Sequence, residues 1–198
     1  MKFSVLISSY NKGKYLEECI LSCLNQTYEV NEIILLDNFS DDGTKQILDR
    51  YKNRIKIVYK NKISKFSPLN QIDLIKEGVN LCSSDIVCLL DADDYFLQDK
   101  IYKLNQVYEN NRAEVVFDIP LIKSNGKYNK LKLKKKIQKN IWPTIINTSA
   151  ISLKKKYLES CINLCLLEDF NLLEIDFRLN AISRCVDKNF YILNQPLS

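Results

Sequence analysis

Three carboxylates stand together in the segment IVCLLDADDY (86–95), where five apolar residues run directly into Asp91, Asp93 and Asp94. A buried strand cannot hold three charged side chains, so the acids are expected where the strand leaves the core. Carboxylates this close repel one another unless a cation shares the site. Mg²⁺ and Mn²⁺ prefer such oxygen ligands and usually also bind substrate phosphates. The segment therefore predicts a metal-bound diphosphate. The alternative is that Asp93 or Asp94 only caps a helix N-terminus.

Polar residues also follow two other apolar runs, FSVLIS (3–8) and EIILLD (32–37). Ligands of open parallel sheets bind at the carboxyl ends of the strands. We therefore expect three strand ends to meet at one edge, with these residues: Ser8, Ser9, Tyr10, Asn11; Asp37, Asn38; Asp91, Ala92, Asp93, Asp94.

Apolar runs alternate with helical patterns through the first two thirds of the chain, which favours a mostly parallel sheet covered by helices on both faces. Ser40 is expected to cap a helix that begins near Asp41–Asp42, and Pro68 to open another. The expected strands are 3–8, 32–37, 54–59, 85–90 and 113–119, and the expected helices include 13–26 and 99–111.

The pattern changes after Pro120. Asn125–Gly126 lies between alternating segments and predicts a hairpin. Residues 152–164 and 166–183 look helical, and 189–193 looks like a short strand. With no repeat and no linker, the sequence favours a single domain over 1–198, with halves 1–119 and 120–198.

Composition narrows the function classes further. The chain has no His, and the spacing of its seven Cys offers no paired knuckles, so a structural zinc site is not expected. The N-terminus does not read as a signal peptide and no apolar run is long enough to span a membrane, which predicts a cytoplasmic protein. The net charge of +5 is concentrated in KYNKLKLKKKIQK (127–139). This stretch is a solvated face, a contact for anionic lipids at the inner face of the membrane, or a nucleic-acid patch.

Residues 5–44, VLISSYNKGKYLEECILSCLNQTYEVNEIILLDNFSDDGT, resemble the opening of family 2 glycosyltransferases, and DIVCLLDADDYF (85–96) looks like the metal motif of that family. The resemblance covers about the first half of the chain. It implies the α/β GT-A nucleotide-sugar-binding fold, which is Rossmann-like, with a mostly parallel central sheet flanked by helices.

The resemblance also implies roles. Ser9 and Tyr10 would meet the nucleotide base, and Asp94 would ligate Mn²⁺ or Mg²⁺ together with Asp93. Glu168–Asp169 resembles the acidic pair of the family, with Asp169 as the base that deprotonates the acceptor and Glu168 beside it; the alternative is a pair of exposed charges at a helix start. The implied donor-binding residues are Ser8, Ser9, Tyr10, Asn11, Asp37, Asn38, Lys76, Asp91, Ala92 and Asp93.

The chain departs from the family pattern in three ways. Asn38 stands where Asp is common, and Ile75–Lys76 replaces an Arg–Asn pair, so that Lys76 or Lys65 could contact the diphosphate. The family often has a metal-binding His beyond a segment like 192–198. Here either the protein is truncated after Ser198 or water completes the coordination.

The implied function is an inverting, metal-dependent glycosyltransferase of surface polysaccharide or lipooligosaccharide synthesis. It would move a sugar from a nucleoside-diphosphate donor, expected to be a UDP-sugar, to a glycan or lipid-linked saccharide. The first alternative is a weak or inactive nucleotide-sugar-binding protein of the same fold. The second is a nucleic-acid-binding module built on 127–139, which is not expected because aromatic residues other than Tyr128 are missing from that stretch.

Overall fold

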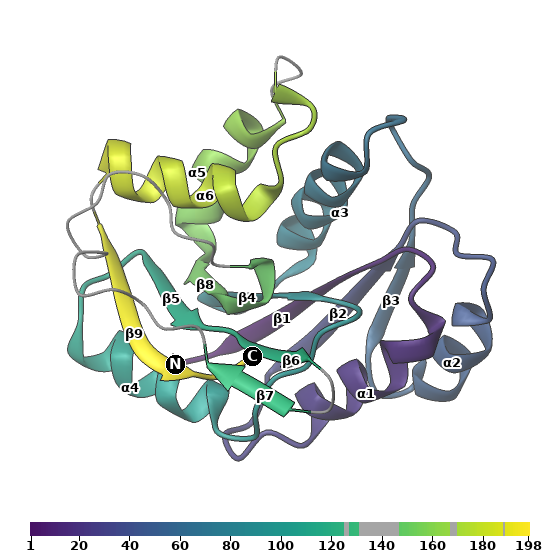
Figure 1. Cartoon of the computed structure of the whole chain (residues 1–198), viewed down its shortest axis with the longest axis horizontal. Coiled ribbons are helices and arrows are strands. Elements are labelled where there is room, and N and C mark those ends of the chain that lie inside the picture. The colour runs from purple at the N-terminus through teal and green to yellow at the C-terminus, as the bar shows by residue number, and fades with distance from the viewer. Residues whose placement is uncertain (125–126, 131–146, 167–169, 188) are drawn as a thin grey trace.

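A single mixed sheet organises the molecule (Figure 1). The computed structural model describes residues 1–124, 127–130, 147–166, 170–187 and 189–198. Within these ranges the main sheet has the order β3-β2-β1-β4-β8-β5-β9. Its strands are β1 (Phe3–Ser9), β2 (Glu32–Asp37), β3 (Lys56–Tyr59), β4 (Ile86–Asp91), β5 (Val115–Ile119), β8 (Ile151–Lys154) and β9 (Phe190–Pro196).

The predicted mostly parallel sheet is confirmed. Strands β1 to β4 pair in parallel, whereas β8 runs antiparallel to both of its neighbours, β4 and β5. Strands from both halves of the chain therefore join one sheet. The helices are α1 (Gly13–Leu24), α2 (Thr44–Tyr51), α3 (Ser67–Leu81), α4 (Lys100–Asn110), α5 (Lys155–Cys165) and α6 (Ile175–Ala181).

The two faces of the sheet bury two separate cores, because successive side chains of a strand point to opposite sides. Val5 and Ile7 of β1 pack with α1, α2 and α4, whereas Leu6 packs with α3, α5 and α6. Figure 1 shows the two groups of helices above and below the sheet. Because both faces are covered there, the central strands β1, β2 and β4 are apolar along most of their length, and polar residues gather at their carboxyl ends.

Helix α3 lies very close to the sheet. Pro68 is in its first turn, as predicted. A Cβ atom built on Gly78 would lie 2.7 Å from a methyl carbon of Leu6 and 2.8 Å from one of Leu36, which shows that this helix approaches β1 and β2 where it has no side chain. The approach fixes the height of α3 above the sheet.

Among the predicted boundaries that differ from the structure, three change the type or the start of an element. The second helix begins at Thr44 rather than near Asp41–Asp42, because the Asp42 carboxylate accepts hydrogen bonds from the backbone and hydroxyl of Thr44. Residues 152–154 belong to β8, since pairing with β4 and β5 outweighs their helical pattern. In the segment 166–183, the helix α6 begins only at Ile175. It continues into a π-helical turn, η4 (Ile182–Asp187).

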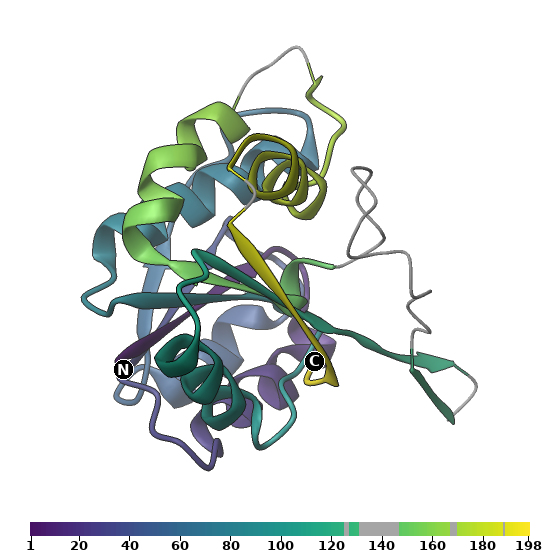
Figure 2. The ribbon, with the colours of Figure 1, turned by 90° about the vertical axis from the view of Figure 1, so that its left-hand side faces the viewer.

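The predicted hairpin after Pro120 is present as β6 (Leu121–Ser124) and β7 (Lys127–Lys130), which pair antiparallel. Figure 2 shows it standing away from the main sheet. Its turn residues Asn125–Gly126 and the basic residues 131–139 lie outside the described residues. Among the helices described, none combines the length and the apolar character needed to cross a membrane.

Candidate functional site

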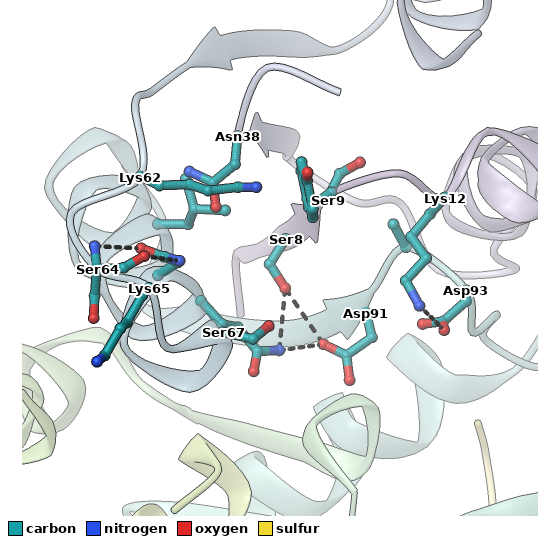
Figure 3. Close-up of a pocket in the computed structure, with 15 residues that line it drawn as sticks. Ser8, Ser9, Lys12, Asn38, Lys62, Ser64, Lys65, Ser67, Asp91 and Asp93 are labelled. Atoms are coloured by element: carbon teal, nitrogen blue, oxygen red, sulfur yellow. Dashed lines mark hydrogen bonds and ion pairs between the residues drawn. The ribbon is translucent and has the colours of Figure 1, made fainter. Parts of the chain in front are cut away.

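The ends of β1 and β4 open into a cavity of about 510 Å³ (Figure 3). Its walls come from these two strands, from the residues after β2, and from the segment that leads into α3. The lining residues are Ser8, Ser9, Tyr10, Lys12, Asn38, Lys62, Ser64, Lys65, Ser67, Asn70, Gln71, Leu74, Asp91, Ala92 and Asp93. The cavity therefore lies at the predicted edge of the sheet.

Asp91, the last residue of β4, forms the floor of the cavity. Its Oδ1 accepts hydrogen bonds from Gln71 Nε2 at 2.5 Å and from Ser8 Oγ at 3.3 Å. Burial, together with the charges of Asp94 and Asp93, raises the pKa of Asp91 to about 7. The carboxylates of this segment are thus close enough to repel one another, which a bound cation would relieve.

Asp93 faces a cation of the chain itself, because Lys12 Nζ lies 2.5 Å from Asp93 Oδ2. The hydrogen bond to Asp93 raises the pKa of Lys12, although partial burial of the ammonium opposes this. The two side chains remain 40% and 38% exposed, so the pair contributes little to stability. Both are free to change partners when a charged ligand enters.

Asp94 is anchored from the turn before β8. Its Oδ2 accepts hydrogen bonds from Ser149 Oγ at 2.6 Å and from Asn147 Nδ2 at 3.0 Å. These are the two hydrogen bonds that described side chains donate to Asp94, and both end on Oδ2. Oδ1 therefore remains available to a ligand. Burial raises the pKa of Asp94, and its hydrogen bond with Ser149 opposes that effect.

A second cavity of about 520 Å³ opens on the other side of Asp93. Two tyrosines, an additional acid and the first residues of the hairpin surround it. Its lining residues are Tyr15, Glu18, Asp93, Asp94, Tyr95, Pro120, Leu121, Ile122, Asn147 and Ser198. Asp93 is the residue that both lining sets contain, so one carboxylate borders two compartments.

The acidic segment suits a divalent cation of the Mg²⁺ or Mn²⁺ type. No three Asp, Glu, Cys or His side chains converge as a metal cage within the described part of the chain. Mg²⁺ sites that hold substrate phosphates commonly use only one or two carboxylates and take their other ligands from phosphate and water. The free Oδ1 of Asp94 and the neighbouring Asp93 match this donor set, whereas a closed all-protein cage does not.

Ser9 and Tyr10 give the cavity its binding character. Ser9 is 2% exposed, and within the part of the chain that the structure describes its hydroxyl has no hydrogen-bond partner. Tyr10 is 41% exposed, and Lys62 Nζ lies 3.1 Å from the centroid of its ring. A buried hydroxyl without a partner is costly unless a ligand satisfies it. Ser9 belongs to the cavity lining, but its hydroxyl oxygen is buried, so a ligand reaches that oxygen only after its neighbours move.

Three predicted donor-binding residues lie outside the cavity lining. Asp37 accepts hydrogen bonds from the backbone and hydroxyl of Ser40, and Asn11 accepts one from the Asp41 backbone, so both side chains shape the loop after β2. Lys76 is five residues beyond Gln71 on α3, which turns it about 140° away from the face that Gln71 presents to the cavity.

Lys12, Lys62 and Gln71 line the cavity although the sequence did not single them out, whereas Lys65 was considered. The position of Lys12, directly after Tyr10–Asn11, was a signal that the sequence offered. That Lys62 and Gln71 line the cavity together depends on how the segment 60–67 folds. Asn70 Oδ1 accepts hydrogen bonds from the backbones of Ile63 and Ser64, and this bends the segment over the strand ends.

The predicted catalytic pair, Glu168 and Asp169, lies outside the described residues. The segment that follows is held by Arg178, which donates hydrogen bonds to the carbonyl groups of Phe170 and Leu173. Asp176 in the first turn of α6 was not predicted as a site residue. Its charge adds a small contribution to the raised pKa of Asp91, behind burial and the charges of Asp94 and Asp93.

Comparison with known proteins identifies relatives for most of the chain. The family model described as glycosyl transferase family 2 matches residues 4–171. The glycosyltransferase GlyG of Streptococcus pneumoniae serotype 4 is 32% identical over 117 residues, which are 57% of this chain and 37% of GlyG. TarS of Staphylococcus aureus, a poly(ribitol-phosphate) beta-N-acetylglucosaminyltransferase, is 27% identical over 130 residues, which are 64% of this chain and 21% of TarS.

Solved structures show the same fold. TarS 1–349 in complex with UDP superposes with a TM-score of 0.73 at 16% identity, covering 100% of this chain and 59% of that one. The mannosyltransferase PcManGT of Pyrobaculum calidifontis, in complex with GDP-Man and Mn²⁺, gives 0.68 at 16% identity over 98% of this chain and 55% of that one. The expected α/β GT-A fold is confirmed. The chain spans well under two thirds of the length of these relatives.

Proposed function

This chain belongs to glycosyl transferase family 2, and from that membership we propose that it transfers a sugar from a nucleoside-diphosphate donor to a hydroxyl group of a saccharide. The observation that carries the proposal is the composition of the first cavity. Lysines line one wall, and Asp91 and Asp93 line another. A diphosphate bridged to a divalent cation needs both kinds of charge within one cavity.

The donor would enter with its base over the ends of β1 and β2. Tyr10 offers a ring face for stacking, and the Ser9 hydroxyl offers a hydrogen bond. Asn38 donates a hydrogen bond to the Lys60 carbonyl at 2.9 Å, which fixes the orientation of its amide beside the base. We favour a UDP-sugar because TarS has been solved with UDP and with UDP-GlcNAc. PcManGT with GDP-Man shows that this fold also accepts guanosine donors.

The diphosphate would lie between the lysines and the acidic segment. Lys62 and Lys65 take the place proposed for Lys76, because they line the cavity and Lys76 does not. Asp93 and Asp94 would hold Mn²⁺ or Mg²⁺. When bound, such an ion withdraws charge from the leaving nucleoside diphosphate. As the diphosphate approaches, Lys12 can leave Asp93 for a phosphate oxygen, since both groups are partly exposed.

The acceptor would occupy the second cavity. Its tyrosines offer flat apolar faces, and its carboxylates accept hydrogen bonds from hydroxyl groups, as a saccharide requires. Asp169 would take the proton of the attacking hydroxyl, with Glu168 beside it. Attack from this side on a donor held in the first cavity corresponds to a single displacement with inversion. The position of Asp93 between the cavities brings both substrates to a common point.

We place the reaction in the synthesis of a surface polysaccharide or lipooligosaccharide, with a glycan or lipid-linked saccharide as acceptor. The support is the relation to TarS, whose name gives a polymer, poly(ribitol-phosphate), as the molecule that it glycosylates. The basic stretch 127–139 would then hold the protein against anionic lipid headgroups at the cytoplasmic face of the membrane.

A thermal-shift panel tests this function. UDP, dTDP and GDP are added with and without Mn²⁺, and one of them should raise the Tm only in the presence of the metal. At a ligand concentration about 100 times Kd the stabilisation is about 2.7 kcal/mol, or about 5–10 °C. The shift should disappear in Asp94→Ala and persist in Asp49→Ala, an exposed acid on α2.

Turnover is then measured with the sugar derivative of the stabilising nucleotide. Release of the nucleoside diphosphate that depends on acceptor supports the transferase. Tight donor binding without turnover in any acceptor mixture would instead indicate a nucleotide-sugar-binding protein of the same fold. A metal-dependent shift that survives Asp94→Ala would contradict the proposed cation site.

A further inference from the structure

A fully buried ion pair lies beneath the acidic segment. Lys100 is the first residue of α4, and Asp118 is the last residue but one of β5 (Val115–Ile119). Lys100 Nζ donates to Asp118 Oδ2 at 2.5 Å, and both side chains are 0% exposed. The ammonium also lies 4.4 Å from the ring centroid of Phe96. The pair therefore connects α4 to β5 within the protein interior.

Stability alone is a weak reason for such a pair. Removing two charges from water costs about as much as their attraction returns, and a buried pair can often be replaced by apolar residues without loss. Asp118 is moreover surrounded in β5 by apolar residues only, in the sequence VVFDI. A polar group retained in this environment suggests another use, and the remaining contacts of Lys100 indicate what it is.

Lys100 holds the turn that carries Ser149. Its ammonium donates a second hydrogen bond, of 2.7 Å, to the carbonyl oxygen of Ser149 in the short helix η2 (Thr148–Ala150). Ser149 is itself 0% exposed. Because Asp118 and Phe96 fix the ammonium, the ammonium in turn ties the backbone of η2 to α4 and β5.

The Ser149 hydroxyl transmits this position to Asp94. It accepts a hydrogen bond from the Asp91 backbone at 3.1 Å, and it donates its single proton to Asp94 Oδ2 at 2.6 Å. A hydroxyl has only one proton to donate, so accepting from Asp91 leaves that proton for Asp94. The result is a carboxylate with Oδ2 tied down and Oδ1 available.

We propose that the buried Lys100–Asp118 pair and Ser149 are positioning residues, which together hold the Asp94 carboxylate in the orientation that a divalent cation requires. This inference rests on the proposed function, because it concerns the cation of the same site. The residues do not touch the cation or the substrate. They act through Asp94, in the way that outer-shell partners orient metal-binding side chains elsewhere.

The test compares Mn²⁺ binding across matched variants of the whole chain, by titration with the electron paramagnetic resonance signal of free Mn²⁺, alone and with saturating UDP. Ser149→Ala should weaken Mn²⁺ binding about 10-fold, as loss of an outer-shell partner typically does, and Ser149→Thr should restore it to within about 3-fold. Ser152→Ala is the control. It removes another fully buried hydroxyl nearby, one that bonds Tyr108 and Val116 rather than Asp94.

The ion pair is tested by Lys100→Met with Asp118→Leu, because the double change leaves no unpaired buried charge. Folding is checked by circular dichroism. If this variant is folded, it should also bind Mn²⁺ about 10-fold more weakly. If it does not fold, the comparison of Ser149→Ala with Ser149→Thr decides.

Wild-type Mn²⁺ affinity in Ser149→Ala would overturn the inference while leaving the proposed function intact, and so would wild-type affinity in a folded double variant. A wild-type protein that binds no Mn²⁺, with or without UDP, would overturn the inference and the proposed cation site together.

Discussion

Replacing Gly78 by Ala tests whether the spacing between α3 and the sheet is set by the missing side chain. The added Cβ would lie 2.7 Å from Leu6 Cδ2 and 2.8 Å from Leu36 Cδ1. Unstrained carbon atoms prefer about 3.5–4.0 Å, so the methyl group arrives about 0.7–1.3 Å too close on both sides. Both leucines are at most 1% exposed and have little room to move.

Two effects of opposite sign decide how much Gly78→Ala changes the free energy of unfolding. Overpacking of this kind costs about 1–3 kcal/mol. Alanine is the better helix former by about 1 kcal/mol, which offsets part of that cost. We therefore expect Gly78→Ala to lower the free energy of unfolding by about 1 kcal/mol, which corresponds to a fall in Tm of about 2–4 °C for a chain of this size.

A double-mutant cycle with Leu6→Ala separates the two effects. Leu6 contributes the closest contact, and removing it also lets Leu36 move into the vacated space. In that background Gly78→Ala should stabilise the protein by about 1 kcal/mol, because the helix-propensity gain remains and the clash is gone. Urea unfolding of the four proteins measures the coupling.

A Gly78→Ala protein about 1 kcal/mol more stable than wild type, which is the full helix-propensity gain with no packing cost, would refute the packing explanation. An equal loss in the wild-type and Leu6→Ala backgrounds would show that contact with Leu6 is not the cause. The affinity for UDP with Mn²⁺ is measured alongside the cycle, since α3 carries Gln71 to the first cavity. If the methyl group lifts the helix, affinity for UDP with Mn²⁺ falls along with stability.

Three further changes test the site and the electrostatics. Lys65→Met should weaken UDP binding about 3- to 10-fold and reduce its salt dependence, whereas Lys76→Met should change neither when both are titrated by calorimetry. Tyr10→Leu should cost about 1–3 kcal/mol of nucleotide binding, the usual worth of one base stacked on a ring, as read from the metal-dependent thermal shift. Burial opposes ionisation of Glu32, but hydrogen bonds from Ser4 and its other partners outweigh it and lower the pKa of Glu32 below 4.5. The stabilisation from ionised Glu32 is thus present above pH 4.5 and is lost as the pH falls through the folded-state pKa. Ser4→Ala should therefore cost about 1 kcal/mol in urea unfolding at pH 7 and clearly less at about pH 3, and an equal cost at both values would contradict this assignment.

The acidic edge of the sheet could be predicted because its signal is local. An apolar run that stops abruptly at Asp91 marks both a buried strand and its exit from the core, and parallel strands bring their ends together. The same logic predicted Ser8 and Ser9. This logic could not assign a role to Asp37, because a carboxylate at a strand end can bind a ligand or hold the next loop. In the structure the Asp37 carboxylate accepts hydrogen bonds from Ser40.

Lys65 was considered from the sequence, but Lys62 was not, because its place in the cavity lining depends on how the segment 60–67 folds. The segment that carries Lys62 folds over the strand ends only because the Asn70 amide binds its backbone. Lys76 lies outside the cavity lining for a related reason. Its spacing from the family motif suggested a site residue, but the rotation of α3 is set by Gly78 against the sheet, and this turns Lys76 away from the cavity.

The arrangement of two compartments that meet at a single carboxylate has a consequence for how such a molecule diversifies. Apart from Asp93, no residue belongs to both described linings. If the first cavity holds the donor and the second the acceptor, as proposed, exchanging the arm around Leu121 and Ile122 between relatives would alter what is glycosylated and leave the activated sugar unchanged. Replacing this one short segment would then change the product, while the half of the fold proposed to recognise the nucleotide stays the same.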